Sequence, residues 1–394
     1  MAWETGDKET RRCPREVAIL TELFSPLALR SVTLPNRIAI PPMCQYAAKD
    51  GMANDFHFAN YARFAMGGAG LIIVEATAID PAGRISHGDL GLWHDAQIRP
   101  LQRLTRFLTS LGAIPAIQIN HGGRKAGQRR PWHGNSPLDQ SDAARGEAPW
   151  PVIGPSALAM ADNWPMPRAL DKSDIQGLVD AWGAAARRAD EAGFEAVEIH
   201  AAHGYLLNQF LSPLSNRRND AYGGDRAGRM RFVLEVTEAV RSCWPRQKPL
   251  LVRVSAVDGV DGGWDIDDTV VLAHELKARG VDAIHCSSGG LFGAATAARL
   301  PRVPGFQVPF AERVRHEARV PTIAVGLILT PQQAADVIDT GKADIVAIGR
   351  EALADPNWAL HARLALLPER GFADWPVESG WWLERRQAAM ATTG

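Results

Sequence analysis

Short apolar runs rich in valine and isoleucine alternate with longer amphipathic segments along the chain from Leu23 onward. The runs are almost continuously apolar rather than alternately apolar and polar, which is typical of parallel strands buried on both faces. Eight runs predict strands, at residues 37–43, 69–77, 114–120, 196–202, 250–256, 282–288, 321–327 and 343–349. The amphipathic segments predict helices at residues 58–66, 98–111, 173–192, 226–243, 267–278, 310–317, 331–340 and 351–366.

The order of these elements predicts the fold class. Eight strand–helix cycles between residues 23 and 366 indicate an α/β fold, a (β/α)₈ TIM barrel. A doubly wound sheet is the alternative, but it would need a glycine-rich dinucleotide turn after its first strand. Met43-Cys-Gln-Tyr46 follows that strand instead. We therefore expect a flexible N-terminal arm over 1–22, a barrel over 23–366, and a tail over 367–394 that can form a subunit interface.

One connection is much longer than a barrel needs. Residues 125–170 follow the third predicted strand, and barrel active sites lie at the carboxyl ends of the strands. A loop of this length is usually either functional or disordered. Trp132, Trp150 and Trp164 suit a packed flap, so we expect a cap over the pocket, with a disordered insertion as the alternative.

Composition and charge exclude several classes of function. The 394 residues hold 43 Lys+Arg and 44 Asp+Glu, so no basic excess is available to bind nucleic acid. The four cysteines form no CxxC pair, which argues against structural zinc or an iron–sulfur cluster and fits a reducing compartment. No apolar run approaches the roughly 18 residues of a membrane span, and residues 1–16 lack the apolar core of a signal peptide. We expect a cytoplasmic protein that binds neither nucleic acid nor membrane.

Polar residues and glycines recur at the ends of the predicted strands, where side chains from different strands converge. The last three turns are glycine-rich: Ser288-Gly-Gly290 after strand six, Gly326 after strand seven, and Gly349-Arg350 after strand eight. Such turns present backbone N–H groups to an anion, and an arginine can add a bidentate contact. They predict a phosphate site, although each glycine alone could simply permit a tight turn.

Two polar residues lie within otherwise apolar strands. Arg253 carries a permanent charge that needs an anionic partner, and a phosphate-anchored cofactor that becomes anionic on reduction would supply one. Gln118 offers an amide that can pair with the edge of a heteroaromatic ring. For each residue taken singly, a buried and satisfied structural pair is an equal alternative.

The fourth predicted strand runs into His200, His203 and Tyr205. Two histidines three residues apart could bind zinc, but a catalytic zinc site needs a third ligand, and no HxH follows strand one. We therefore predict no metal. Two imidazoles that donate hydrogen bonds to a substrate oxygen, with Tyr205 as a proton donor, fit better.

Several motifs together resemble the old yellow enzyme family, in its thermophilic-like, xenobiotic reductase branch. They are Pro41-Pro-Met-Cys-Gln-Tyr46, Gln118 with His121-Gly-Gly-Arg-Lys-Ala126, His200-Ala-Ala-His-Gly-Tyr205 with its continuation to Pro213, Asn216-Arg-Arg-Asn-Asp-Ala-Tyr-Gly-Gly224, and Ser287-Ser-Gly-Gly290. The resemblance runs in order from about Leu23 to Leu366. It implies an FMN enzyme that takes hydride from NADPH or NADH and reduces the activated C=C bond of an α,β-unsaturated carbonyl or nitro compound.

The resemblance also implies a role for each matching residue. His200 and His203 would polarise the substrate oxygen and Tyr205 would protonate the α-carbon, while Tyr46 and Trp358 would shape the pocket. Trp358 could instead be helix packing, and Cys44 either tunes the flavin or is a small buried hydrophobe. The residues expected around the flavin are Pro42, Met43, Cys44, Ala76, Gln118 and Arg253, and those at its phosphate end are Ser288, Gly289, Gly290, Gly326, Gly349 and Arg350.

Two other functions stay open. One is a different FMN barrel, such as a hydroxy acid oxidase or a dihydroorotate dehydrogenase, and the other is a barrel that binds or senses a ligand without turnover. The tail departs from the family pattern, in which many relatives of this branch end in Tyr-x-Arg and reach a neighbouring subunit. Here it reads Trp375-Pro-Val-Glu-Ser-Gly-Trp-Trp-Leu-Glu-Arg-Arg386. We expect a homodimer or homotetramer, with the cross-subunit contact in doubt.

Overall fold

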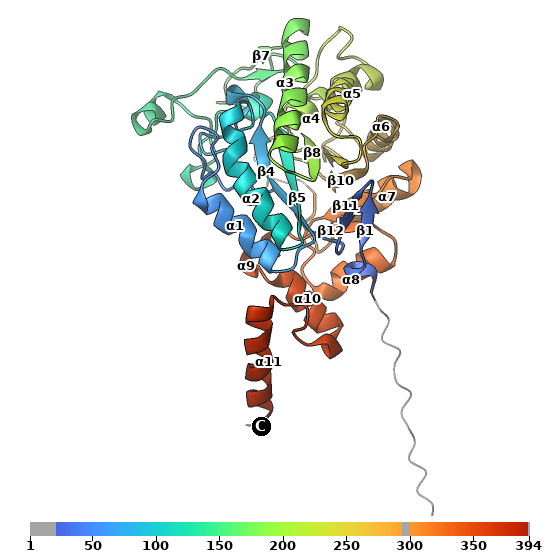
Figure 1. Ribbon diagram of the computed structural model, residues 1–394. Coiled ribbons are helices and arrows are strands. Elements are labelled where there is room, and N and C mark those ends of the chain that lie inside the picture. Colours follow the sequence, from blue (N-terminus) through green and yellow to red (C-terminus); the bar gives the residue numbers. More distant parts are fainter. Residues whose placement is uncertain (1–20, 294–299, 393–394) are drawn as a thin grey trace, which may run out of the picture.

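Eight parallel strands close into a barrel in the computed structural model, which describes residues 21–293 and 300–392 (Figure 1). They follow one another around the barrel in chain order, so that each strand–helix unit packs beside the next. The strands are β3 (Ile38–Ile40), β4 (Leu71–Ala78), β5 (Ile114–Asn120), β8 (Ala196–Ala201), β9 (Leu250–Ser255), β10 (Ala283–Ser287), β11 (Thr322–Val325) and β12 (Ile345–Ala347). The predicted (β/α)₈ barrel is confirmed.

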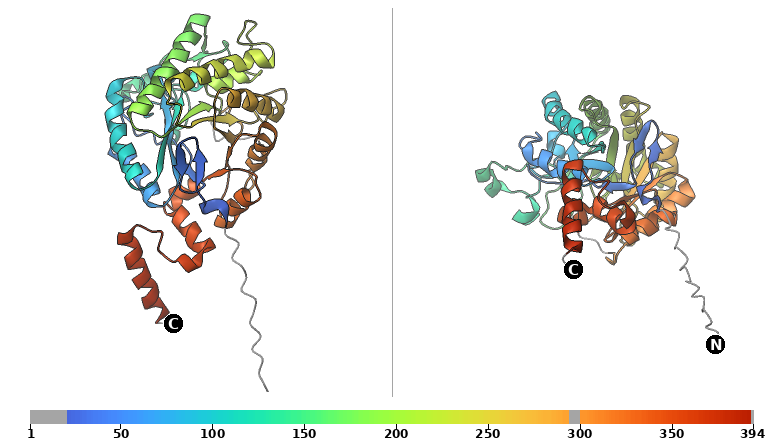
Figure 2. Two further views of the ribbon diagram at one scale, coloured as in Figure 1. Left: turned by 45° about the vertical axis from the view of Figure 1, so that its right-hand side comes forward. Right: turned by 60° about the horizontal axis from the view of Figure 1, so that its bottom comes forward.

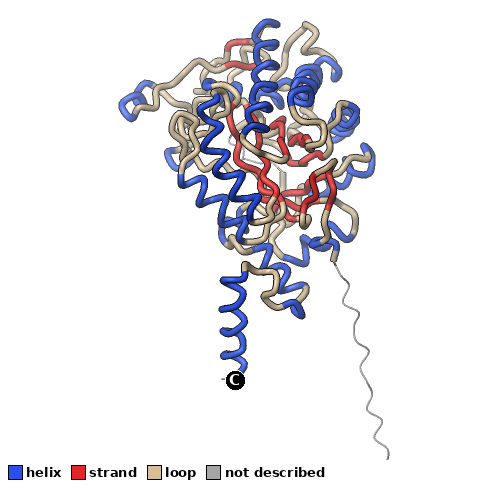
Figure 3. The backbone as a smooth tube through the Cα atoms, viewed as in Figure 1, coloured by secondary structure: helices blue, strands red, loops and turns tan. Residues whose placement is uncertain are grey.

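Helices surround the strands (Figure 3). They are α1 (Asp55–Met66), α2 (Ile98–Ser110), α3 (Lys172–Glu191), α5 (Arg226–Cys243), α6 (Ile266–Ala278), α7 (Val308–Ala318), α8 (Pro331–Asp339), α9 (Arg350–Ala354) and α10 (Trp358–Leu366). Side-chain caps fix several helix starts: the Asp171 carboxylate accepts from Asp174 N at α3, and the Thr330 hydroxyl accepts from Gln333 N at α8. One apolar face of each long helix packs onto the sheet, as their amphipathic patterns predict.

The predicted single helix over 351–366 is in fact two helices, α9 and α10. Asp355 ends α9 in an extended conformation, and Pro356 follows it. A proline cannot continue the hydrogen-bond ladder of a helix, and it pushes the preceding residue out of the helical region. The Asp355 carboxylate then accepts from Asn357 N at 3.0 Å, which stabilises the turn into α10.

The interior of the barrel changes from apolar to polar along the strands. An apolar cluster fills the amino-terminal end; it includes Ala39, Leu71, Ile73, Ala116, Ala196, Leu251, Ala283, Ile323 and Ile345. Because residues two apart share one face of a strand, the next inward positions are Gln118, Glu198, Arg253 and His285. The strands therefore deliver polar side chains to the carboxyl end, where barrel active sites lie.

Several elements were not predicted, because each is short or lies outside the periodic part of the chain. They are the hairpin β1 (Leu27–Leu29) and β2 (Val32–Leu34), the pair β6 (Ile153–Gly154) and β7 (Arg168–Ala169), and the helices α4 (Leu206–Leu211) and α11 (Val377–Ala391). Leu29 and Leu34 join the apolar interior cluster, so the hairpin covers the amino-terminal end of the barrel. Residues 1–20 of the expected arm lie outside the described residues, while Glu22 N donates to Asp339 at 2.8 Å.

The segment 125–170 packs against the loops that follow β3 and β4. Trp150 Nε1 donates to the Ala82 carbonyl at 2.9 Å, and Arg130 Nε donates to the Tyr46 carbonyl at 3.1 Å. The Trp132 ring meets the Tyr46 ring edge-on, with 5.7 Å between centroids. These contacts place the segment beside the loops at the carboxyl ends of β3 and β4.

The C-terminal helix α11 stands away from the barrel (Figures 1 and 2). Along the described helix Gly380 is the one buried residue, packed near the Phe372 carbonyl. Trp381 and Trp382 are 46% and 66% exposed. In the described part of the chain, no helix is both long enough and apolar enough to cross a membrane.

Candidate active site

The side chains of His200, His203 and Tyr205 meet where β8 ends. The rings of His203 and Tyr205 each stand edge-on to the His200 ring, with 5.0 Å between ring centroids. The chain turns sharply here, because His203 and Gly204 have φ of 58° and 71°. A Cβ added to Gly290, in the turn after β10, would lie 2.7 Å from His203 Cα, so this close approach requires glycine. The two turns thus fix each other and the histidines.

Hydrogen bonds link the two histidines in one direction. The N–H of Ala202 donates to His200 Nδ1 at 3.2 Å, so a neutral His200 carries its hydrogen on Nε2. That nitrogen lies 3.3 Å from His203 Nδ1, which must then accept. His203 Nε2 is 2.6 Å from Ser287 Oγ, and Ser287 Oγ is 3.4 Å from Gln307 Oε1. We call this series, from Ala202 to Gln307, the histidine relay.

Burial sets the protonation state of the three side chains. Burial, and next the charge of Arg253, hold the pKa of His200 and His203 well below the usual value. Burial raises the pKa of Tyr205 well above its usual value, with smaller contributions from nearby acidic groups. At neutral pH the imidazoles are therefore neutral and the phenol keeps its proton, which are the states that a hydrogen-bond donor pair and a general acid require.

Tyr205 lies against residues from the ends of the first two barrel strands. It forms a small cluster with Ala76, Ile85 and the half-buried Cys44. Burial, and then Asp89 and Glu75, raise the pKa of the Cys44 thiol well above its usual value. Cys44 is therefore a protonated thiol, not a thiolate nucleophile.

Tyr46 lies at the same edge of the barrel, and its contribution to a substrate pocket stays a prediction. It adopts a left-handed conformation with φ of 55°. Burial raises the pKa of its phenol, and Cys44 and Tyr205 add to the increase because they are close. Tyr46 is thus next to Tyr205 on one side and next to Trp132 on the other.

Lys125 is a buried site residue that the sequence did not identify. Its Nζ donates to the carbonyls of His203 at 2.8 Å and Gly290 at 2.7 Å, and it lies 5.1 Å from the centre of the Tyr205 ring. Burial, followed by the charge of Arg124, lowers the pKa of Lys125 to about 7. The available signal is its place within the motif His121-Gly-Gly-Arg-Lys-Ala126. Its position at the start of the long connection 125–170 gives no sign that it is buried beside Tyr205.

Gln118 and Arg253 belong to a polar layer inside the barrel. Gln118 Nε2 lies 2.7 Å from Glu198 Oε1, and His285 Nδ1 lies 2.8 Å from Glu198 Oε2. The Nε of Arg253 is buried and has no hydrogen-bond partner among the described residues. Glu198 and His285 were not predicted, although a charged residue inside an apolar strand is the signal that had identified Arg253.

A cavity of about 320 Å³ opens over the carboxyl ends of β9 to β12 and β3. Of the described residues that line it, seven are among the twelve expected to hold the cofactor: Pro42, Met43, Arg253, Ser288, Gly326, Gly349 and Arg350. His203 and Ser287 of the histidine relay also line it, so the cavity and the β8 exit form one site. The other five expected residues, Cys44, Ala76, Gln118, Gly289 and Gly290, lie outside this lining.

Gln307 closes the wall of the cavity and was also missed. Its Oε1 accepts from Ser288 Oγ at 2.7 Å, and its Nε2 donates to the Val325 carbonyl at 3.1 Å. This side chain joins the ends of β10 and β11. Arg302 adds an exposed positive charge to the rim.

Trp358 is not part of this lining. It begins α10, is 7% exposed and belongs to the main hydrophobic cluster. Its contribution to a substrate pocket stays a prediction, and the alternative reading, helix packing, describes its observed surroundings.

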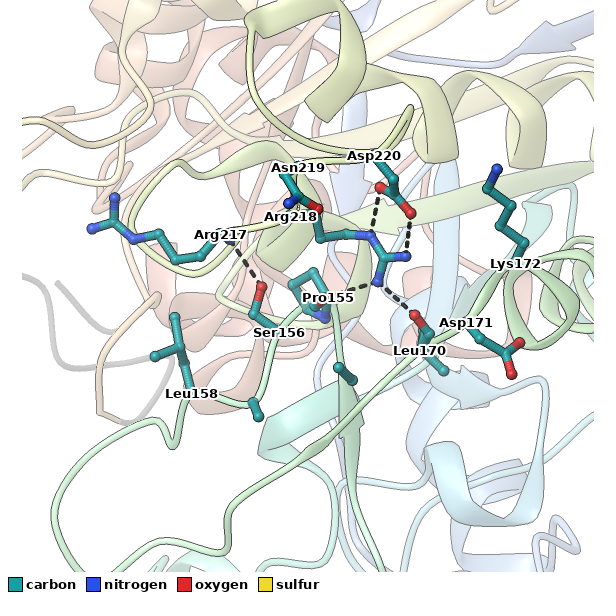
Figure 4. A pocket seen from close by; sticks show the side chains of 12 residues that line it. Pro155, Ser156, Leu158, Leu170, Asp171, Lys172, Arg217, Arg218, Asn219 and Asp220 are labelled. Carbon is teal, nitrogen blue, oxygen red and sulfur yellow. Dashed lines mark hydrogen bonds and ion pairs between the residues drawn. The ribbon is translucent and has the colours of Figure 1, made fainter.

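A larger groove, of about 650 Å³, lies between the segment 155–172 and the loop after α4 (Figure 4). Its principal charged group, Arg218, is already paired: both carboxylate oxygens of Asp220 accept from it, as do the carbonyls of Pro155 and Leu170. The Arg217 side chain points away from this cluster in Figure 4. Arg218, in the loop after α4, therefore ties the segment 125–170 to the barrel.

The residues of the cavity fit FMN. Arg253 brings a buried permanent charge with an unpartnered Nε. Such a charge requires an anionic partner, and no described carboxylate forms an ion pair with it. Glycines and Arg350 line the end where a phosphate was expected. In the described residues, no group of three or more His, Cys, Asp or Glu side chains could hold a metal ion.

A family model described as "NADH:flavin oxidoreductase / NADH oxidase family" matches residues 22–366. The chain belongs to this family. The match confirms the resemblance to the old yellow enzymes and the expectation of an oxidoreductase that uses FMN and a nicotinamide. It also favours this reading over a hydroxy acid oxidase or a dihydroorotate dehydrogenase.

Relatives in the old yellow enzyme family are similar over nearly their whole length. The chain is 45% identical over 340 residues to an NADPH dehydrogenase of Geobacillus thermodenitrificans, covering 86% of this chain and 92% of the relative. It is 43% identical over 349 residues to an NADPH dehydrogenase of Listeria welshimeri, covering 88% and 96%. Among solved structures, morphinone reductase matches with a TM-score of 0.73 and 30% identity, covering 88% of this chain and 90% of that chain.

Proposed function

We propose that the protein reduces activated C=C bonds of α,β-unsaturated carbonyl or nitro compounds with electrons from NADPH or NADH. Bound FMN would supply the hydride transfer, from the nicotinamide to the β-carbon of the alkene. A proton must then reach the α-carbon, so that the alkene gains two electrons and two hydrogens while the nicotinamide is oxidised. The observation that carries the proposal is that the rings of His200, His203 and Tyr205 meet beside a cavity lined by His203 and Arg253.

His200 and His203 would bind the substrate oxygen. Both N–H groups are engaged in the histidine relay, so an incoming oxygen has to displace one of the existing acceptors. The 3.3 Å contact between the rings is the longer and weaker of the two. We infer that the substrate oxygen competes for this contact first and polarises its carbonyl or nitro group through an imidazole N–H.

Tyr205 would supply the proton. Its buried phenol stays protonated at neutral pH, and its ring lies against Ala76 and Cys44 rather than in open solvent. Lys125 Nζ lies 5.1 Å from the ring, and in its protonated form it favours the phenolate that forms when the proton leaves. Proton donation by a positioned side chain contributes a factor of about 10² to 10⁴.

The cavity residues would hold the cofactor. Pro42, Met43 and Arg253 would meet the flavin ring, with Gln118, Cys44 and Ala76 around its edge. Ser288, Gly326, Gly349 and Arg350 would receive the phosphate, as their convergence on one cavity supports, and Gly289 and Gly290 would complete the turn that presents Ser288. The names of the relatives, NADPH dehydrogenase and morphinone reductase, support a nicotinamide reductant and an organic substrate that is reduced.

The test is an anaerobic pair of half-reactions on the FMN-loaded protein. We expect NADPH or NADH to bleach the oxidised flavin, and a cyclic enone or a nitroalkene to restore its colour. Lactate and dihydroorotate serve as controls for the alternative flavin barrels. Reduction by the nicotinamide without reoxidation by either alkene would contradict the proposal, and bleaching by lactate or dihydroorotate would favour an alternative.

We also propose self-association through the tail and a cytoplasmic location. The exposed tryptophans of α11 support the first, because such side chains are enriched at protein interfaces. The described cysteines Cys44, Cys243 and Cys286 are all free thiols, which supports a reducing compartment. The proposed assembly is a homodimer or a homotetramer.

A further inference from the structure

Four polar side chains share one layer of the barrel interior, a step below His200 and Ser287. They are Gln118 on β5, Glu198 on β8, Arg253 on β9 and His285 on β10, and each is at most 8% exposed. Gln118 is the register partner of Glu198, and His285 is the register partner of Arg253. Two of the four, Glu198 and His285, have no part in the chemistry proposed above.

The hydrogen bonds of Glu198 fix the orientation of its neighbours. Its Oε1 is 2.7 Å from Gln118 Nε2, and its Oε2 is 2.8 Å from His285 Nδ1. A carboxylate only accepts hydrogen bonds, so the amide nitrogen of Gln118 must face Glu198. The amide oxygen of Gln118 is then the atom left for a ligand. By the same rule, His285 carries a hydrogen on Nδ1.

Charge in this layer is balanced between two residues. Arg253 is always cationic, and the Glu198 carboxylate accepts from two donors, Gln118 Nε2 and His285 Nδ1. Burial and the charge of Arg253 lower the pKa of His285, so this imidazole is a neutral donor. The negative charge of Glu198 acts on Arg253 and opposes the effect of burial on its pKa. Arg253 lines the cavity and Glu198 lies behind it.

We propose that Glu198 is a positioning residue that orients the amide of Gln118 and offsets the charge of Arg253, and so holds the reduction potential of bound FMN below the value that Arg253 alone would set. The inference rests on the proposed placement of FMN over this layer. Flavin gains negative charge on reduction, and a nearby carboxylate disfavours that gain while a guanidinium favours it. The pair would therefore set how readily the flavin passes hydride on.

Glu198→Gln tests the proposal, because glutamine can keep the shape of the network while losing its charge. The new amide can accept from Gln118 and donate to His285, whose hydrogen moves to the other ring nitrogen. We expect the midpoint potential of bound FMN, measured by anaerobic titration against a reference dye, to rise. A tenfold shift of the reduced-to-oxidised ratio corresponds to about 30 mV for a two-electron couple. An unchanged potential would overturn the proposal.

Two controls separate charge from structural disturbance. His285→Gln keeps both a donor to Glu198 and the carboxylate charge, and Asp258→Asn removes another buried carboxylate, whose nearby cation is Arg124 rather than Arg253. Both should leave the potential at the wild-type value. A rise in either variant as large as that of Glu198→Gln would overturn the charge argument.

If Glu198→Gln does not retain FMN, the variant Glu198→Asp, which keeps the negative charge, is tested instead. The proposal expects Glu198→Asp to retain FMN at the wild-type potential, and loss of FMN from this variant too would overturn it. Enone reduction by the wild-type protein is measured in parallel. Its absence would overturn the proposed function and leave the comparison of potentials interpretable.

Discussion

Burial moves the pKa of neighbouring side chains in opposite directions at the exit of β8. It raises the pKa of Tyr205 and lowers that of His200 and His203, because each group loses its charged form in a medium of low dielectric constant. All three are uncharged at neutral pH, and each still carries a hydrogen to donate. One physical cause thus gives the protonation states that both the proposed acid and the proposed pair of hydrogen-bond donors need.

Tyr205→Phe should slow the alkene half-reaction and spare the flavin half-reaction. We expect the rate of flavin reoxidation by an enone to fall by a factor of about 10² to 10⁴, the usual contribution of a general acid. Flavin reduction by NADPH should stay within about threefold of wild type, since that step needs no proton from Tyr205. Anaerobic stopped-flow absorbance measures both. The matched control is Tyr222→Phe, which removes a hydroxyl bonded to Glu235. If both changes altered the rate of flavin reoxidation equally, Tyr205 would not be the acid.

His200→Ala and His203→Ala should weaken ligands that bind through a phenolate oxygen. A hydrogen bond to a charged group contributes about 1.5–3 kcal/mol, so each variant should lose roughly 10- to 100-fold in affinity. The charge-transfer absorbance between oxidised flavin and a phenol gives the dissociation constant directly. His361→Ala, a change of a half-exposed histidine on α10, should leave the constant unaltered. Unaltered affinity in both active-site variants would contradict the donor role.

At the scale of elements, an irregularity in β4 directs two consecutive side chains to different parts of the barrel. The register with β5 shifts between Val74 and Thr77. Glu75 thereby contacts α1, where Tyr61 donates to its Oε2 at 2.7 Å, and Gln45 N donates to its Oε1 at 3.0 Å. The next residue, Ala76, faces the Tyr205 cluster instead. The bulge connects helix packing to the loop that carries Cys44 and Tyr46.

Glu75→Gln should change how stability depends on pH. Burial raises the pKa of Glu75 to about 8, against 4.5 as its usual value, so the folded state binds this proton more tightly than the unfolded state. The stability that the wild-type protein has with Glu75 protonated is fully present below pH 4.5, and it is lost as pH rises from 4.5 toward 8. Glutamine imitates the neutral acid, so the variant should match wild type near pH 5 and gain relative stability above it.

The expected gain of Glu75→Gln is on the order of 1 kcal/mol per pH unit between pH 5 and 8. Urea unfolding at pH 5.0, 6.5 and 8.0 measures it. Glu238→Gln removes a surface carboxylate bonded to Arg279 and should show no such trend. Parallel pH dependence in wild type and Glu75→Gln would show that Glu75 ionises normally in the folded state.

The barrel strands were predictable because burial on both faces leaves a continuous apolar signal, whereas short or exposed elements leave none. The three-residue strands of the β1–β2 hairpin and the six-residue α4 are below the length at which periodicity can be read. At the site, the histidines and Arg253 were found by their chemistry. Glu198, Lys125 and Gln307 were missed because their importance depends on partners far away in the sequence.

At the scale of the whole molecule, the barrel and α11 differ in how they are held. The barrel has a continuous apolar core that extends from Leu23 to Ala362, while α11 buries Gly380 alone among its described residues. Trp381 and Trp382 lie edge-on to each other and remain largely exposed. A helix with so little packing against its own barrel is suited to contact a second molecule.

Truncation after Trp375 should leave the barrel folded and change its assembly. We expect FMN to be retained and the melting temperature to move by no more than about 2 °C, because little buried surface is lost. The mass in solution, measured by light scattering after gel filtration, should fall relative to the full chain. Trp381→Ala with Trp382→Ala should reproduce the change in mass. An unaltered mass in both variants would place any subunit contact elsewhere.

The direction of the histidine relay implies that the tautomer of His203 changes when both histidines donate to one bound oxygen. His200 Nε2 can donate to a bound oxygen without any change, but His203 Nδ1 is an acceptor in the relay. If His203 is to donate to the same oxygen, its hydrogen must move from Nε2 to Nδ1, and Ser287 must then donate to Nε2 instead of accepting. A tautomer change leaves the number of protons on the ring the same, so no net proton is taken up from solvent or released to it. Binding of a neutral ligand should therefore show the same calorimetric enthalpy in buffers of different ionisation enthalpy, and the ring nitrogens of His203 should exchange their ¹⁵N chemical shifts.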